Sequence, residues 1–83
     1  MKILYFAWLK EKTSLAEEDL SLPCGVSTVA GLMEYLKNRG GGFADAFADS
    51  TLVRVAVNME HVQTSHPLNN ADEVAFFPPV TGG

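Results

Sequence analysis

Residues 72–79 read Asp-Glu-Val-Ala-Phe-Phe-Pro-Pro. From Val74 onwards both alternating sets of side chains are apolar, which is typical of a strand in the middle of a sheet. The two prolines that follow have no backbone N–H to donate, so the hydrogen-bonded ladder must end at Phe77. The stretch therefore predicts a central strand over residues 72–77 with an abrupt end.

The N-terminal segment has the same character. Residues 2–9, Lys-Ile-Leu-Tyr-Phe-Ala-Trp-Leu, are apolar on both alternating faces, which predicts a second central strand beside the last one. Strand alternation would place Phe6 and Trp8 together, on the face opposite Tyr5. The charged run at 10–14 that follows is expected to form a loop.

An edge strand is expected before the middle of the chain. Asp19-Leu20-Ser21-Leu22 alternates polar and apolar side chains, as a half-buried edge strand does, and Pro23 ends it. The acidic run Glu17-Glu18-Asp19 is interpreted as a solvated loop. Cys24 is interpreted as a small apolar filler beside Pro23, because no neighbouring group would activate its thiol.

The strongest helical signal lies in the next segment. Apolar side chains recur at positions i, i+3, i+4 and i+7 and form one stripe, namely Val29, Leu32, Met33 and Leu36. The hydroxyl of Ser27 or Thr28 can cap the first turn, and the glycines at 40–42 are expected to stop the helix. Residues 43–47 are expected to add one short helical turn.

Two further strands complete the element order. Residues 52–57 predict a strong strand and residues 61–63 a short one, with a turn at 58–60. The helix can then cross one face of the sheet, with a right-handed connection, and bring the last strand beside the first. We therefore predict an α+β fold of the β-grasp, or ubiquitin-like, type: a mixed sheet of four or five strands packed on one main helix. The domain would span residues 1–79, followed by a flexible C-terminal tail at 80–83.

The composition narrows the possible functions. The 83 residues fit one domain, and a domain of this size has little core to give up for an internal active site. A formal net charge of −4 with only six Lys and Arg residues argues against nucleic-acid binding, which depends on cations placed against phosphates. His61 and His66 have no companions at metal-ligand spacing, so no metal site is expected. The apolar N-terminal run is too short to span a membrane and no signal-peptide cleavage site follows it, so we expect a cytoplasmic protein.

The last four residues have a composition suited to a reactive chain end. Val80, Thr81, Gly82 and Gly83 follow the two prolines, and four extended residues reach about 13 Å, enough to enter a channel in another protein. Glycine has no Cβ, so the backbone can pass a constriction and lie close to a nucleotide. A carboxylate is a poor acyl donor, whereas its adenylate can be attacked by a sulfur nucleophile to leave a thiocarboxylate. We therefore expect the Gly83 carboxylate to be the working group.

A resemblance to a known family rests on residues 72–83, Ile3–Ala7, Val57-Asn58 and His66–Leu68. These segments resemble the MoaD-type sulfur carriers, the small subunits of molybdopterin synthases. The resemblance implies a subunit that is not an enzyme on its own and binds no cofactor. An ATP-using, ubiquitin-activating-type adenylyltransferase would adenylate Gly83, and a sulfur donor protein would convert the adenylate to a thiocarboxylate.

The same resemblance implies a partner and a docking surface. The tail, residues 80–83, would insert into the large subunit of molybdopterin synthase and pass sulfur to cyclic pyranopterin monophosphate, which becomes molybdopterin. Two small subunits would assemble at opposite ends of a large-subunit dimer, as a heterotetramer. Phe6, Phe77, Pro78 and His61 would form the docking surface.

Two positions depart from the family pattern. Family members often have Gly where this chain has Ala71, so Asn69 or Asn70 is expected to adopt the positive φ of that turn. At the position of His61 the family's docking surface is typically apolar.

Three other functions remain open at this point. One is the thiazole-forming sulfur carrier of thiamine synthesis, which shares the fold and the Gly-Gly end. Another is a ubiquitin-like modifier joined to lysines through Gly83, and the last is an interaction module with an inert tail.

Overall fold

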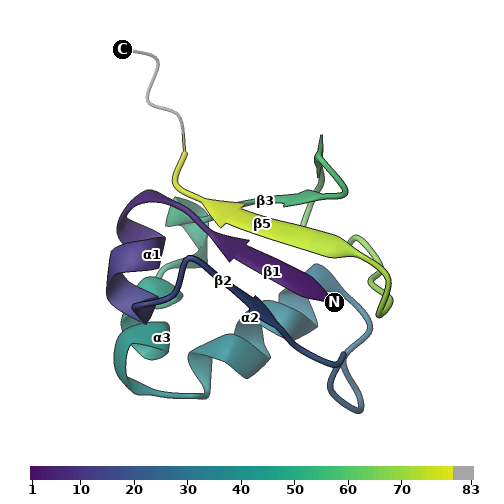
Figure 1. The fold of residues 1–83 in the computed structure, drawn as a ribbon, viewed down its shortest axis with the longest axis horizontal. Helices are drawn as coiled ribbons and strands as arrows, with labels where there is room; N and C mark the ends of the chain where they lie inside the picture. Colours follow the sequence, from purple (N-terminus) through teal and green to yellow (C-terminus); the bar gives the residue numbers. More distant parts are fainter. Residues whose placement is uncertain (80–83) are drawn as a thin grey trace.

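The computed structural model describes residues 1–79 and contains five strands in one mixed sheet. In chain order the strands are β1 (Lys2–Tyr5), β2 (Glu17–Asp19), β3 (Arg54–Val57), β4 (Glu60–His61) and β5 (Glu73–Phe77). Their order across the sheet is β2-β1-β5-β3-β4. β5 lies between β1, to which it is parallel, and β3, to which it is antiparallel (Figure 1). The predicted central position of the last strand, beside the first, is confirmed.

Helices cover one side of this sheet. They are α1 (Ala7–Thr13), α2 (Val29–Lys37) and α3 (Gly41–Ala46), and a 3-10 turn, η1 (Ser50–Leu52), precedes β3. In Figure 1, α2 and α3 lie beneath the sheet and α1 lies beyond the end of β1. The four apolar residues predicted for the main helix, α2, are all buried. The Thr28 hydroxyl caps α2 by accepting a hydrogen bond from the Gly31 N–H at 3.2 Å.

The core lies between the sheet and these helices. Along β5, Val74 and Phe76 are buried while Ala75 and Phe77 are half-buried. The Phe76 ring packs edge-to-face on Phe47, with 5.1 Å between ring centroids. Only one of the two apolar faces of β5 therefore belongs to the core, and the other faces away from the helices.

The strand predicted over residues 2–9 is wrong beyond Tyr5. Phe6 is extended and its N–H donates to the Phe76 carbonyl oxygen at 3.1 Å, after which Ala7, at φ 53°, turns the chain into α1. In α1 Leu9 is fully buried and Trp8 is half-buried against the core. A short apolar run fits a strand or a buried helix equally well, and here packing of α1 against α3 selects the helix.

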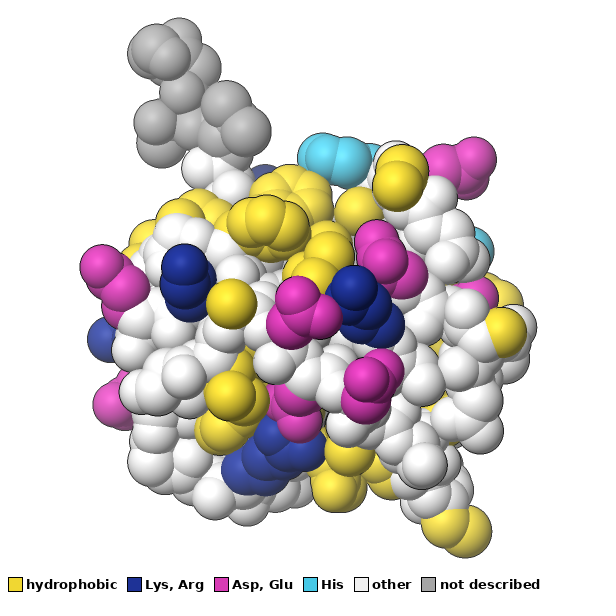
Figure 2. Space-filling view, in the orientation of Figure 1, with side chains coloured by type: hydrophobic (Ala, Val, Ile, Leu, Met, Phe, Trp, Pro, Cys, Tyr) yellow, Lys and Arg dark blue, Asp and Glu magenta, His cyan; other side chains and the backbone are white. Residues whose placement is uncertain are grey.

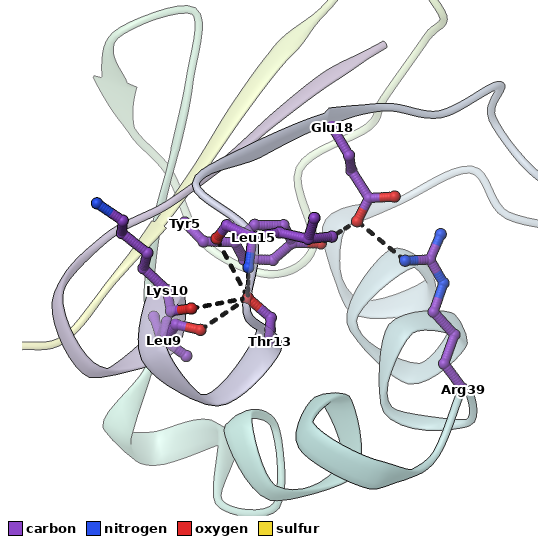
Figure 3. A network of polar contacts seen from close by, with 7 residues as sticks. All are labelled: Tyr5, Leu9, Lys10, Thr13, Leu15, Glu18 and Arg39. Atoms are coloured by element: carbon purple, nitrogen blue, oxygen red, sulfur yellow. Dashed lines mark hydrogen bonds and ion pairs between the residues drawn. The ribbon is translucent and has the colours of Figure 1, made fainter.

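The loop expected at 10–14 is also wrong, because most of it belongs to α1. Thr13 is buried, and its Oγ1 donates to the Leu9 carbonyl oxygen at 2.9 Å and accepts from the Leu15 N–H at 3.3 Å (Figure 3). Ser14, at φ 62°, then ends the helix in a left-handed conformation. Hydrogen bonding inside the last turn thus allows a polar residue to be buried there.

The edge strand begins and ends earlier than predicted. β2 covers Glu17–Asp19, the run interpreted as a solvated loop, and stops before the predicted strand at 19–22 is complete. It pairs antiparallel with β1, with Ile3 opposite Glu18. Glu18 therefore faces the helices, where it has hydrogen-bond partners, so the strand alternates although all three of its residues are acidic. Cys24 is exposed in the following turn and is not a buried filler.

Other boundaries differ by a few residues. β3 begins at Arg54, because the residues before it form η1, in which the Asp49 carboxylate accepts a hydrogen bond from the Thr51 N–H at 3.0 Å. The short strand β4 covers Glu60–His61 in place of 61–63. α3 confirms the predicted short helical turn and starts at Gly41, inside the glycine run.

Candidate functional site

The face of the sheet opposite the helices is called here the open face. Because paired residues share a face, register places Leu4, Ala75 and Ala56 side by side across its centre. Ala56 is buried yet does not contribute to the core cluster, which agrees with its position on the open face. The centre of this face is therefore apolar, unlike the outer face of most small sheets.

At the end of β5 this apolar strip widens into a group of larger side chains, called here the tail-end patch: Phe6, Phe77, Pro78 and His61. The Phe6 ring is 48% exposed, and the hydrogen bond from its N–H to Phe76 continues the parallel register, so Phe6 lies beside Phe77. The His61 ring lies against Phe77, with 5.0 Å between centroids and a 55° tilt. Figure 2 shows hydrophobic side chains gathered at this end of the molecule, next to a histidine.

Trp8 does not join this patch, contrary to the prediction from strand alternation. The chain turns at Ala7, so the indole lies on α1, where it lines a groove with Leu52 and Ala46. The prediction failed because alternation holds only while the backbone stays extended.

Charged residues are distributed unevenly over the open face. Arg54 lies directly opposite Phe77 on β3, at the tail-end patch. At the other end Lys2 lies between Asp19 and Glu73 in the sheet, and its Nζ is 3.3 Å from Glu17 Oε2. Figure 2 shows this mixture of acidic and basic side chains below the hydrophobic group. The tail-end patch thus has one cationic neighbour, Arg54, although the chain as a whole is acidic.

A polar network on the covered side holds the two N-terminal strands to the end of α2. The buried Tyr5 hydroxyl donates to Glu18 Oε2 at 2.7 Å, and Arg39 Nη1 donates to the same oxygen at 2.9 Å (Figure 3). Burial raises the pKa of Tyr5 far above its ordinary value, and Glu18 raises it further. The hydrogen bond to Glu18 also raises the pKa of Arg39, whose guanidinium lies 4.7 Å from the Phe43 ring centroid.

A second polar cluster sets the β3–β4 turn that carries His61. Asn58 and Met59 both have positive φ. Asn58 Nδ2 donates to Asp72 Oδ1 at 2.9 Å, and the Glu73 N–H donates to Asn58 Oδ1 at 3.0 Å. These bonds fasten the turn to the start of β5 and so fix where β4 begins.

The turn before β5 is closed by Asp72 and not by a left-handed asparagine. Asp72 Oδ2 accepts a hydrogen bond from the Asn69 N–H at 2.9 Å, and Asn69 Oδ1 accepts one from the Ala71 N–H at 2.8 Å. The expectation of a positive φ at Asn69 or Asn70 is wrong, because these side-chain bonds form the turn without one. The Asn69 N–H, followed by the Asn58 amide, lowers the pKa of Asp72.

The described residues contain neither a metal-binding cluster nor a membrane-spanning helix. Among residues 1–79, no group of three or more His, Cys, Asp and Glu side chains could hold a metal ion. In the same range, no helix has both the length and the hydropathy needed to cross a membrane. Val80, Thr81, Gly82 and Gly83, predicted to form the reactive tail, lie outside the described residues.

Sheet order, the parallel β1–β5 pair and the single main helix define a β-grasp protein of the ubiquitin-like class. Within that class the chain belongs to the ThiS family, whose model matches residues 3–83.

Relatives of known name match over the full length. The chain is 40% identical over 85 residues to the molybdopterin synthase sulfur carrier subunit of Escherichia coli K12, covering 100% of this chain and 99% of the relative. It is 30% identical over 86 residues to the human protein of the same name, covering 100% and 93%.

Solved structures agree on the fold. A protein of Pyrococcus furiosus assigned as a molybdopterin converting factor, subunit 1, superposes with a TM-score of 0.75 at 32% identity, covering 95% of both chains. SAMP1 of Haloferax volcanii superposes with a TM-score of 0.73 at 25% identity, covering 100% of this chain and 98% of the other.

Proposed function

We propose that this chain is the sulfur carrier subunit of a molybdopterin synthase and acts in molybdenum cofactor biosynthesis. The observation that carries the proposal is the full-length similarity, at 40% identity, to the Escherichia coli carrier subunit. The fold supports it, since β5 is a central strand, and in the sequence it is followed by two prolines and then by Val80-Thr81-Gly82-Gly83.

The proposed chemistry takes place at the carboxylate of Gly83. An ATP-using, ubiquitin-activating-type adenylyltransferase joins this carboxylate to AMP and releases pyrophosphate. A sulfur donor protein then supplies sulfide-level sulfur, which forms a C–S bond as the C–O bond to AMP breaks. When the thiocarboxylate sulfur is passed to cyclic pyranopterin monophosphate, the acyl carbon takes its oxygen back from water. The dithiolene of molybdopterin contains two sulfur atoms, so the carrier must be recharged.

In this cycle the chain is the substrate of one enzyme and a subunit of another. It needs no bound cofactor, because ATP is used by the activating enzyme and the pterin is held by the large subunit. All of these steps are assigned to the cytoplasm.

The tail-end patch is the proposed docking surface for the large subunit. Its apolar side chains lie where β5 ends, so contact there would direct residues 80–83 into the partner. Phe6, which is exposed, and Phe77, which is half-buried, are the proposed anchors, because aromatic rings that a partner covers contribute much of the energy of such interfaces. Pro78 and His61 would border them in a heterotetramer of two small and two large subunits.

The proposal is tested by intact-mass measurement of the full chain. Incubation with the cognate adenylyltransferase, ATP and a sulfur source should raise the mass by the difference between one sulfur and one oxygen atom. A variant that lacks Gly83 should show no mass gain while melting at the wild-type temperature. An unchanged mass for the wild-type chain, with an adenylyltransferase active on another carrier, would contradict a sulfur-carrier role.

Two related functions, the thiamine-pathway sulfur carrier and the protein modifier, can be distinguished from the proposed one by the partner bound and the product formed. Co-purification with a thiazole synthase, and not with a molybdopterin synthase large subunit, would identify the thiamine-pathway carrier instead. The similarity of fold to SAMP1 makes protein conjugation worth testing. High-mass conjugates that disappear when Gly83 is deleted would identify a modifier.

A further inference from the structure

His61 places an imidazole within the otherwise apolar tail-end patch. It lies opposite Ala56 on the edge strand β4, and its ring centroid is 5.0 Å from that of Phe77. The side chain is exposed, and among residues 1–79 it forms no ion pair. An imidazole always carries at least one N–H donor, and the protonated ring carries two. A polar, titratable group therefore lies where docking would exclude water.

This position has a consequence for any partner that covers the patch. A donor removed from water must find an acceptor, or the desolvation of the N–H weakens binding. Arg54 lies opposite Phe77 on the same face, and its guanidinium donates a long hydrogen bond of 3.5 Å to the Thr51 carbonyl oxygen. The side of the patch formed by β3 and β4 thus carries one full positive charge on the open face, that of Arg54, and an acidic partner side chain would complement it.

We propose that the large-subunit surface facing His61 and Arg54 carries an acidic side chain, and that protonated His61 pairs with it in the complex. This inference rests on the proposed docking of the tail-end patch. The inference predicts that the partner surface facing position 61 is negatively charged. An apolar side chain at this position would give no such prediction.

The proposed pairing makes the affinity for the large subunit depend on pH, and the charges around His61 give the direction of that dependence. Arg54 on β3 and Glu73 on β5 share the open face with it, and Glu60 precedes it on β4. A partner carboxylate would favour the imidazolium in the complex, so docking would take up a proton. Affinity should therefore rise as the pH falls through the range in which imidazoles titrate, about pH 8 to 5.

The test is calorimetric titration of the full chain with the molybdopterin synthase large subunit of the same organism, at pH 6 and pH 8. His61→Gln keeps an N–H donor but cannot be protonated. His66→Gln is the matched control, because His66 is the only other histidine and lies in the connection before β5. The ratio of variant to wild-type Kd cancels titration of independent groups on the large subunit.

We expect the Kd of His61→Gln to exceed the wild-type Kd by about 5- to 20-fold at pH 6 and by less than about 2-fold at pH 8. The ratio for His66→Gln should be the same at both pH values. Wild-type binding near pH 7, measured in two buffers of different ionisation enthalpy, should show proton uptake that His61→Gln lacks.

Two results would overturn the inference in distinguishable ways. A His61→Gln ratio that is equal at both pH values, or larger at pH 8, would reject the acidic counterpart and leave the carrier function intact. If the wild-type chain binds the large subunit at neither pH, the proposed function fails together with the inference.

Discussion

The Glu18 carboxylate holds three parts of the protein together. One of its oxygens accepts hydrogen bonds from the Tyr5 hydroxyl and from Arg39. Glu18 thereby joins β1, its own strand β2 and the segment after α2. A hydrogen-bonded carboxylate of this kind is costly to leave unpaired but contributes modestly when one neutral donor is removed.

Tyr5→Phe should therefore lower the free energy of unfolding by about 1 kcal/mol, since Glu18 loses one donor and keeps Arg39. Tyr35→Phe is the control, because Tyr35 is 37% exposed and should change stability by less than about 0.5 kcal/mol. Urea unfolding followed by circular dichroism measures both variants. If both variants had the same free energy of unfolding, the Tyr5–Glu18 hydrogen bond would make no net contribution to stability.

Asp72 makes stability depend on pH at the acidic end. Its pKa is lowered from the ordinary 3.8 by hydrogen bonds from the Asn69 N–H and the Asn58 amide. The folded state therefore favours the ionised carboxylate. This contribution is fully present above the ordinary pKa and is lost as the pH falls through the lowered one.

Asp72→Asn should accordingly flatten the loss of thermal stability below about pH 4 while lowering stability at pH 7. Asp45→Asn makes the same charge change on the exposed surface of α3 and serves as the control. Melting curves recorded between pH 2.5 and pH 7, in steps of about half a pH unit, measure this difference in stability. Parallel curves for Asp72→Asn and the wild type would reject the assignment.

Helices α1 and α3 touch through backbone as well as side chains. A Cβ at Gly42 would collide with the carbonyl oxygen of Lys12 in α1. The glycine run therefore does more than stop α2: Gly40, at φ 79°, turns the chain, and Gly42 permits the close approach of the next helix.

Gly42→Ala should destabilise the domain by about 1–3 kcal/mol, because α1 or α3 must move to admit the methyl group. Gly31→Ala is the matched control within α2, where the nearest atom to a Cβ is Val26 Cγ1 at 3.4 Å. Its higher helix propensity should make Gly31→Ala neutral or stabilising by up to about 1 kcal/mol. Chemical denaturation compares them, and a fully stable Gly42→Ala would mean that the helices separate without cost.

In the molecule as a whole, apolar side chains that do not belong to the core gather on the open face of the sheet. Helices bury the inner face of the sheet, while the open face presents Leu4, Ala75 and the tail-end patch beside the end of β5. A surface of this kind, rimmed by charge, is typical of a protein-binding site.

Phe77→Asp should weaken binding of the full chain to the molybdopterin synthase large subunit by about 30-fold or more, as expected for an aromatic anchor. Leu52→Asp is the control, because Leu52 is an apolar residue more exposed than Phe77, at 49%, on η1 beside the Trp8 groove. Surface plasmon resonance gives both affinities, with circular dichroism to verify folding. A larger loss for Leu52→Asp than for Phe77→Asp would move the docking surface to the α1–η1 side.

Local patterns in the chain were sufficient for much of the fold. The two-sided apolar strand before Pro78 implied a central position, because a run that is apolar on both faces is typical of a strand whose two faces are both covered. The 3.6-residue stripe and the Thr28 cap likewise determined α2. The grouping of Phe6 with Phe77 was implied by the family resemblance and not by alternation, and it holds because the chain is still extended at Phe6.

Other features depended on contacts between distant residues. Residues 7–13 form a helix because α3 lies where their apolar side chains can be buried, and Glu17–Asp19 form a strand because Tyr5 and Arg39 provide partners for Glu18. The position of His61 against Phe77 depends on a turn that Asn58 and Asp72 fasten across 14 residues. A short segment has nearly equal local preferences for several conformations, so the burial and hydrogen bonds supplied by the rest of the protein make the choice.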